Sequence, residues 1–286
     1  MSAPSERAIR VPGLTLAARE WGDSSAPHKV LALHGWLDNC ATFDGLAPLL
    51  SGVHLIALDL PGHGRSEHRS ANDTYHFIDW IPEVVAAADD LGWQRFTLMG
   101  HSMGAAVASI TAGTVPERVR GVVLLDGMAP FATAPKDAPG TLAAYIRQRT
   151  RLLEKERPFY PSREAATERL LKVANLTREA ATTLVGRNTI EAAEGVVWTY
   201  DTRLRRISPM RFTDEHNRAF LRAITAPVLF VRPTDGIPVD ETLLATWVGD
   251  IGKLTRASPV GGHHVHLEYP DRVAPMVQDF LQGLPE

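Results

Sequence analysis

A single serine lies between two glycines at the point where an apolar run gives way to an alanine-rich run. The stretch is TLMGHSMGAAV (97–107), and its centre, Gly100-His101-Ser102-Met103-Gly104, fits the pattern G-x-S-x-G. Glycines allow neighbouring backbone to pass where a Cβ would collide. A tight strand-to-helix turn of this kind lifts the hydroxyl above a sheet and places the first N–H groups of a helix beside it. The pattern therefore predicts that Ser102 is a nucleophile.

Six short runs rich in Val, Ile and Leu end in Gly, His or Asp, and helical patterns lie between several of them. Nearly continuous apolar runs are typical of strands buried on both faces of a parallel sheet. Strands that alternate with helices predict an α/β fold, with ligands bound at the carboxyl ends of the strands. The predicted strands lie within residues 29–36, 53–64, 95–102, 118–127, 226–236 and 253–264, and the predicted helices within 77–91, 103–115 and 270–281.

The alternation breaks between about Phe131 and Arg222, where the sequence reads as helices with no good strand between them. We predict a helical cap here, with the core in residues 1–130 and 223–286 and the cap in 131–222. The cap holds 17 Lys and Arg against 11 Asp and Glu. Solvated helix faces account for this charge, and the competing hypothesis is that RLRRISPMR (203–211) favours anionic substrates.

The bulk composition excludes several classes of protein. The chain has 286 residues, a net charge of −3 and a single cysteine, Cys40, so no internal disulfide forms. A reducing, cytoplasmic location is the simpler expectation. The N-terminus lacks the apolar segment of a secretory signal, no apolar run is long enough for a membrane helix, and the charge does not favour nucleic acid. Monomer and homodimer both stay open.

Three further stretches complete a resemblance that covers nearly the whole chain. They are LALHGWLDN (31–39), LDLPGHGRS (58–66) and GGHHVHLEYP (261–270). With the G-x-S-x-G segment, they resemble the α/β-hydrolase family, and within it serine hydrolase-like proteins of the esterase or lipase type. The resemblance implies a mostly parallel central sheet flanked by helices, with an inserted helical cap. Asp59, which ends one of the predicted strands, is expected to cap a loop.

The resemblance also assigns roles to residues of this chain. Many members end in Gly-His-x-x-His-x-Glu-x-Pro, and its first histidine, the general base, matches His263. The N–H groups of Trp36 and Met103 would form the oxyanion hole. The residues expected to bind substrate are His34, Gly35 and His101, although the two imidazoles could instead shape loops through hydrogen bonds.

Two aspartates compete to orient the histidine. Asp235 follows the strand PVLFV at the usual family position, but its loop, RPTDG, lacks the usual preceding glycine and is one residue shorter. Asp126 ends GVVLLDG, and some family members take the acid from that earlier strand. Asp235 is the preferred candidate and Asp126 the alternative.

These residues predict a hydrolase that acts on a carboxylic ester or thioester of a small or medium acyl group through an acyl-enzyme. Neither a cofactor nor a metal is expected, because His263, His264 and His266 lack a partnered ligand set at usual spacing. Serine at position 102 argues against dehalogenases and epoxide hydrolases, which use aspartate there. A cofactor-free peroxidase and a non-catalytic ligand-binding protein remain the alternatives.

Overall fold

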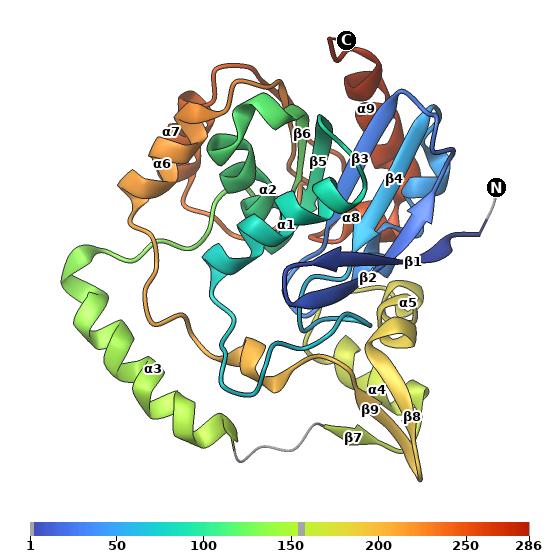
Figure 1. The fold of residues 1–286 in the computed structure, drawn as a ribbon, viewed down its shortest axis with the longest axis vertical. Coiled ribbons are helices and arrows are strands. Elements are labelled where there is room, and N and C mark those ends of the chain that lie inside the picture. The colour runs from blue at the N-terminus through green and yellow to red at the C-terminus, as the bar shows by residue number, and fades with distance from the viewer. Residues whose placement is uncertain (1–2, 154–157, 286) are drawn as a thin grey trace.

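The computed structural model describes residues 3–153 and 158–285 and centres on an eight-stranded sheet (Figure 1). The strand order is β1-β2-β4-β3-β5-β6-β10-β11. Six of these strands run parallel to one another: β3 (His28–Leu33), β4 (Val53–Leu58), β5 (Phe96–His101), β6 (Val119–Leu125), β10 (Val228–Val231) and β11 (Leu254–Ala257). An antiparallel hairpin of β1 (Ser5–Val11) and β2 (Leu14–Trp21) completes one edge. The predicted α/β-hydrolase architecture is confirmed.

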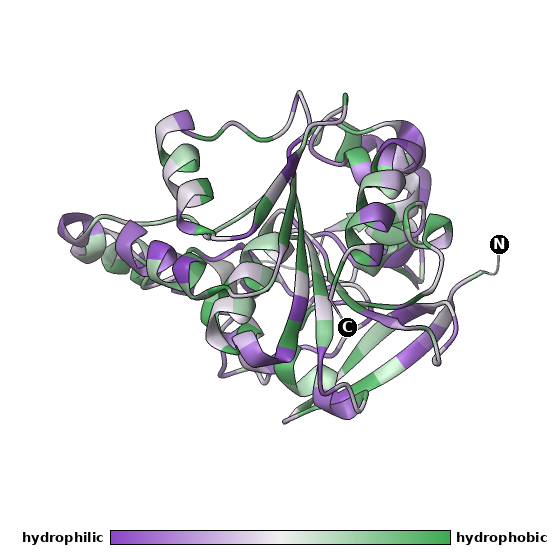
Figure 2. Ribbon diagram, turned by 90° about the horizontal axis from the view of Figure 1, so that it is seen from above, coloured by the Kyte–Doolittle hydropathy of each residue, from purple (hydrophilic) through white to green (hydrophobic). Residues whose placement is uncertain are grey.

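Both faces of the parallel strands are buried, which explains their continuous apolar runs. Within β3, Leu31 and Leu33 pack into one hydrophobic cluster, while Val30 and Ala32 pack into a second cluster on the other face. Helices α1 (Trp80–Asp90), α2 (Met103–Thr114) and α7 (Glu241–Asp250) contribute to the first cluster, and α9 (Pro270–Gln282) contributes to the second. Figure 2 shows the largely hydrophobic strands running between helices of mixed hydropathy.

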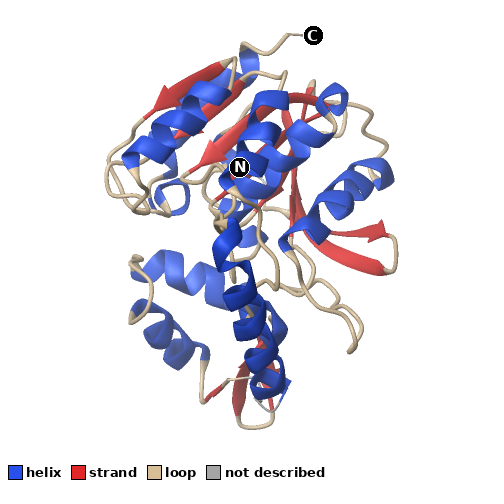
Figure 3. Cartoon of the chain, turned by 90° about the vertical axis from the view of Figure 1, so that its left-hand side faces the viewer, coloured by secondary structure: helices blue, strands red, loops and turns tan. Residues whose placement is uncertain are grey.

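The insertion between β6 and β10 is not wholly helical, which corrects the sequence prediction. It contains α3 (Ala138–Leu153), α4 (Arg163–Leu171) and α5 (Arg178–Asn188), but also a three-stranded antiparallel sheet. The strands of this sheet are β7 (Phe159–Tyr160), β8 (Thr189–Ala192) and β9 (Gly195–Trp198). Figure 3 shows these elements gathered at one end of the molecule. Strands of two to four residues are too short to produce a readable alternation of apolar and polar side chains.

Helix α6 (Asp214–Ala223), which the sequence placed in the cap, packs against the core beside α2 (Figure 1). A Cβ on Gly113 of α2 would lie 2.3 Å from the carbonyl oxygen of Phe220 on α6. Trp247 of α7 also donates to Asp214 at 2.7 Å. The predicted division at residue 222 therefore assigns one core-packed helix to the cap.

Within the described residues, no helix is both long enough and apolar enough to cross a lipid bilayer.

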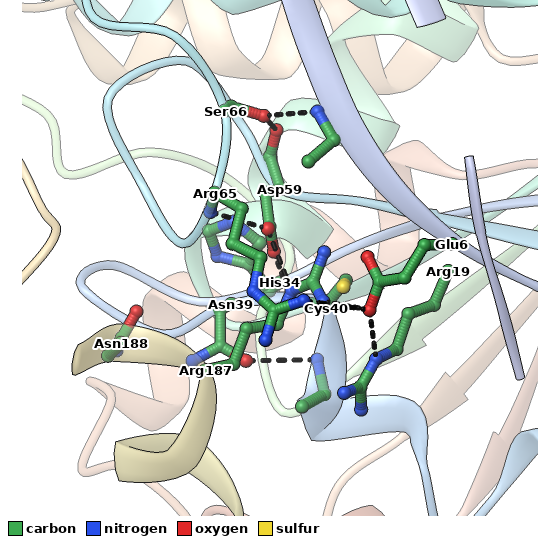
Figure 4. A network of polar contacts seen from close by, with 12 residues as sticks. Glu6, Arg19, His34, Asn39, Cys40, Asp59, Arg65, Ser66, Arg187 and Asn188 are labelled. Carbon is green, nitrogen blue, oxygen red and sulfur yellow. Dashed lines mark hydrogen bonds and ion pairs between the residues drawn. The ribbon is translucent and has the colours of Figure 1, made fainter. Parts of the chain in front are cut away.

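A buried ion pair joins the cap to the core (Figure 4). Arg187 of α5 is 1% exposed, and its Nε donates to Oδ2 of the fully buried Asp59 at 2.8 Å. Its Nη1 donates to Glu6 of β1 at 2.7 Å. Burial alone would lower the pKa of Arg187, but the Asp59 carboxylate raises it above its ordinary value, so the guanidinium stays charged.

Asp59 caps the loop that follows β4, as the sequence predicts. Its carboxylate accepts the backbone N–H groups of Cys40 and Arg65, each at 2.8 Å. A Cβ on Gly64, whose φ is +52°, would lie 2.3 Å from the same carboxylate. The Asp59 carboxylate therefore ties the loops after β3 and β4 to each other and to the cap.

Replacing Arg187 with methionine is expected to lower the free energy of unfolding by about 3–5 kcal/mol, because Asp59 would be left as a buried charge without its partner. Arg178→Met is the matched control, since Arg178 pairs with Glu164 and Glu168 on the surface, and it should change stability by less than about 0.5 kcal/mol. Urea unfolding measures both. Equal changes in the two variants would show that the buried pair does not anchor the cap.

Candidate active site

Ser102 occupies a strained turn between β5 and α2, with φ +52° and ψ −114°. The turn requires glycine on both sides. A Cβ on Gly100 would lie 2.2 Å from the carbonyl oxygen of Gly104, and a Cβ on Gly104 would lie 2.1 Å from the carbonyl oxygen of Leu33. Because the turn costs free energy and persists, the surrounding packing must hold it in place. The predicted strand-to-helix elbow is present.

His263 is bound to Asp126. Its Nδ1 lies 2.6 Å from Asp126 Oδ2, and that oxygen also accepts the backbone N–H of Ile237 at 2.9 Å. Asp126 follows β6, has a φ of +45° and is only 3% exposed. A buried carboxylate that accepts from Nδ1 fixes the ring orientation and leaves Nε2 free to take a proton.

The preference for Asp235 as the partner of His263 is therefore corrected in favour of Asp126. Asp235 is exposed, and its carboxylate accepts from Thr234 Oγ1 at 3.0 Å. Its contribution to the histidine loop is through the backbone, because its N–H donates to the Gly261 carbonyl at 2.9 Å. The shortened loop after β10 leaves the side chain of Asp235 outside the site.

Ser102 and His263 lie on adjoining segments at the carboxyl edge of the sheet. The Ser102 N–H donates to the carbonyl of Leu125, next to Asp126, at 2.9 Å, and His101 Nε2 lies 3.1 Å from the carbonyl oxygen of His263. Both Ser102 and His263 are partly exposed. In the part of the chain that the structure describes, no hydrogen bond joins Ser102 Oγ to His263. Such contacts are often long before substrate binds.

The loop that carries Trp36 follows β3, next to the first turn of α2. The Cβ that Gly104 lacks would also lie 2.7 Å from the carbonyl oxygen of His34, so the two segments are in close contact. Trp36 is exposed, and its Nε1 donates to the cap at the Leu204 carbonyl at 3.1 Å. Trp36 and Met103 therefore lie on adjoining segments beside Ser102.

His34, Gly35 and His101, which the sequence analysis expected to bind substrate, are all buried. The Leu60 N–H donates to His34 Nε2 at 3.0 Å, so the ring proton is on Nδ1, which donates to the Gly35 carbonyl at 2.7 Å. His34 therefore shapes the loop, which is the alternative that the sequence left open for it.

A second polar cluster, which the sequence analysis missed, lies beneath the site. His264 Nε2 is 3.0 Å from Asp38 Oδ2, and His101 Nδ1 is 3.5 Å from the same oxygen. Burial, with the nearby His264, lowers the pKa of His101 to about 3. Burial alone would raise the pKa of Asp38, but His264 lowers it well below its ordinary value. Asp38 in HGWLDN was the residue that could have indicated this cluster. Its partners, His101 and His264, lie far from it in the sequence, so no local pattern connects them.

Comparisons with known proteins identify the family of the chain. Residues 29–270 match the family described as the alpha/beta hydrolase fold. The chain belongs to this family. It is 34% identical to the serine hydrolase-like protein of Danio rerio, over 98% of this chain and 89% of the fish protein. It is 32% identical to serine hydrolase-like protein 2 of Homo sapiens, over 97% and 94% of the two chains.

A solved crystal structure has the same architecture along nearly its whole length. The crystal structure of a hypothetical protein from Pseudomonas aeruginosa PAO1 superposes with a TM-score of 0.91 at 36% identity. The superposition covers 97% of this chain and 99% of the other. The resemblance that the sequence motifs indicated is confirmed at the level of the family.

Gly104→Ala is expected to destabilise the protein by at least about 3 kcal/mol, the upper end of overpacking costs, because the new Cβ would meet backbone that cannot rotate away. Gly249→Ala is the control: it lies in α7 with nothing within 4 Å of the added Cβ, so it should be neutral or stabilising by up to about 1 kcal/mol. Thermal and urea unfolding measure both. A soluble Gly104→Ala variant of unchanged stability would contradict the packing argument.

Proposed function

We propose that this alpha/beta hydrolase is a serine hydrolase that cleaves a carboxylic ester or thioester of a small or medium acyl group. The observation that carries the proposal is the 2.6 Å contact between His263 Nδ1 and Asp126 Oδ2, beside a serine in a strained elbow. The serine hydrolase-like relatives support a serine nucleophile, and the ester preference rests on the chemistry of the site.

In the proposed mechanism, Ser102 Oγ attacks the substrate carbonyl carbon while His263 Nε2 takes the hydroxyl proton. Asp126 holds the Nδ1 proton of His263 and stabilises the imidazolium that forms. His263 then passes the proton to the leaving alcohol or thiol. Water attacks the acyl-enzyme in the second half of the reaction, with His263 again acting as the base.

The proposed oxyanion hole consists of the backbone N–H groups of Trp36 and Met103. Met103 is the first residue of α2, so the partial positive charge of the helix N-terminus adds to its hydrogen bond. The removal of one such donor typically costs about 10²–10³ in turnover. Backbone donors need no rearrangement when the negative charge develops, which is why they suit this role.

Two alternatives remain testable on the same site. A cofactor-free peroxidase would use the same serine and histidine, and activity with acetate, peroxide and halide would reveal it. A non-catalytic ligand-binding protein has no need for a base held by a buried carboxylate next to a serine. The contact between His263 and Asp126 therefore favours catalysis.

A fluorophosphonate probe is expected to label Ser102 stoichiometrically, because only an activated serine reacts rapidly. Mass spectrometry of the modified peptide identifies the site, and His263→Ala should abolish labelling. Folded protein that is not labelled would contradict the proposal and favour the ligand-binding alternative.

The rate of ester hydrolysis separates the two aspartates. Asp126→Asn is expected to lower ester hydrolysis by roughly 10⁴-fold, the loss known for the acid of a protease triad. Asp235→Asn is the matched control and should retain nearly full activity, because its side chain is exposed. Equal effects of the two substitutions would contradict the assignment of Asp126.

The arginine-rich segment 203–211 of the cap supports a finer proposal, that the substrate carries a negative charge. Arg203 already forms an ion pair with Asp201, with Nη2 and Oδ2 2.6 Å apart. By contrast, Nε and Nη2 of Arg206 are buried and have no hydrogen-bond partner among the described residues. Leu204, two residues earlier, accepts from the Trp36 ring, so this segment adjoins the proposed oxyanion hole.

Arg206→Gln is expected to lower kcat/KM for an anionic ester, such as a succinate monoester, by about 10- to 100-fold, equivalent to one lost charge-assisted hydrogen bond. A neutral ester of the same alcohol should be hydrolysed as before. Arg205→Gln, which changes an exposed neighbour, is the control. If Arg206→Gln lowered kcat/KM equally for both esters, the result would contradict recognition of the substrate's charge by Arg206.

A further inference from the structure

Three side chains from distant parts of the chain converge beneath the proposed triad. Asp38 follows β3, His101 ends β5, and His264 precedes the short helix α8 (Val265–Glu268). Asp38 Oδ2, His101 Nδ1 and His264 Nε2 all lie within 4.8 Å of one another. His264 Nε2 donates to the carboxylate oxygen at 3.0 Å, and His101 Nδ1 lies 3.5 Å from the same oxygen. An ion that replaced the His264 proton would have all three side chains within reach.

The hydrogen bond of His101 leaves one ring nitrogen without a partner. Its Nε2 faces the carbonyl oxygen of His263 at 3.1 Å, and a carbonyl can only accept, so Nε2 carries the proton. In the neutral ring, Nδ1 then presents a lone pair toward the carboxylate of Asp38. His101 is fully buried, and its Nδ1 has no hydrogen-bond partner among the described residues. Two facing acceptors repel each other unless a proton or a metal ion lies between them.

The hydrogen bond from His101 Nε2 to the His263 carbonyl is of the kind that a metal-binding histidine usually makes with its second ring nitrogen. Such a histidine donates its second ring N–H to a carboxylate, a water or a backbone carbonyl, which fixes the tautomer that points the other nitrogen at the metal. His101 already makes this contact with the His263 carbonyl.

Gly35 keeps the space beside the cluster free of side-chain atoms. A Cβ at this position would lie 2.9 Å from Asp38 Oδ2 and 3.0 Å from His101 Nδ1. The side chains of Asp38 and His264 keep 14% and 11% exposure, so an ion could reach the cluster from solvent.

We propose that Asp38 Oδ2, His101 Nδ1 and His264 Nε2 bind a divalent transition-metal ion of the Zn²⁺ class. Two imidazoles and one carboxylate are a ligand set that Zn²⁺ favours, and a water would complete four-coordination. This set differs from His263, His264 and His266, which the sequence analysis considered and set aside. Sequence spacing could not predict this set, because residues 38, 101 and 264 are far apart in the chain.

The position of the site gives the ion a structural effect on the proposed triad. His101 immediately precedes Ser102, and His264 immediately follows His263. An ion bound by both would connect the nucleophile turn to the histidine loop and restrain their relative movement. Metal binding is itself independent of the proposed hydrolase activity.

The test is calorimetric titration of the chelator-treated full chain with Zn²⁺, together with the visible absorption spectrum of the Co²⁺ form. We expect one ion per chain and a Co²⁺ spectrum distinct from that of the aqueous ion. His264→Gln keeps a donor for Asp38 but removes the imidazole, and it should weaken binding by about 10- to 100-fold or more. Asp38→Asn should have a similar effect.

His28→Asn is the matched control, because His28 lies at the start of β3, at the opposite end of the strands, and its loss should leave the affinity unchanged. Circular dichroism verifies that each variant folds. An unchanged affinity in His264→Gln and Asp38→Asn would overturn the proposal. So would an aqueous-like Co²⁺ spectrum of the unmodified protein, which decides the matter even where a variant does not fold. Neither measurement uses ester hydrolysis, so failure of the proposed function would be seen separately.

Discussion

The nucleophile turn depends on the contact between the first turn of α2 and the end of β3. At Gly104 the two backbones approach so closely that no side chain fits between them. This contact fixes the helix N-terminus beside the loop of Trp36 and holds Ser102 in its strained turn. The parallel sheet then brings the end of β6, with Asp126, to the same edge. Close backbone packing therefore fixes the positions of Ser102 and the helix N-terminus more precisely than contacts between flexible side chains could.

Two polar networks, one fully buried and one partly exposed, lie at this edge of the sheet. One centres on Asp59, which binds two loop N–H groups and the guanidinium of Arg187. The other centres on Asp38, which faces His101 and His264. Carboxylates shielded from water are costly unless they are partnered, so the contacts of each carboxylate favour one arrangement of its loops. The first fixes the cap on the core, and the second fixes the histidine loop against the nucleophile turn.

The sequence predicted the parallel strands, the elbow at Ser102 and the loop-capping role of Asp59 from local patterns alone. His263 came from a family resemblance, because one of several late histidines cannot be chosen by spacing. The choice between Asp126 and Asp235 failed for a physical reason: both follow strands that are neighbours in the sheet, and only loop geometry decides which side chain turns inward. The short strands of the cap and the role of Asp38 depend on tertiary contacts that no local pattern records.

The order of strands in the sheet has a consequence for how the protein is made. β6 and β10 are adjacent, yet the whole cap lies between them in the sequence. During synthesis, the edge of β6 stays without its neighbour until the cap has emerged, and an unpaired edge invites association with other chains. His263 arrives later still, so a nascent chain contains the serine long before it contains the histidine. Premature termination within the cap would consequently yield a fragment that exposes the edge of β6 and is prone to aggregate.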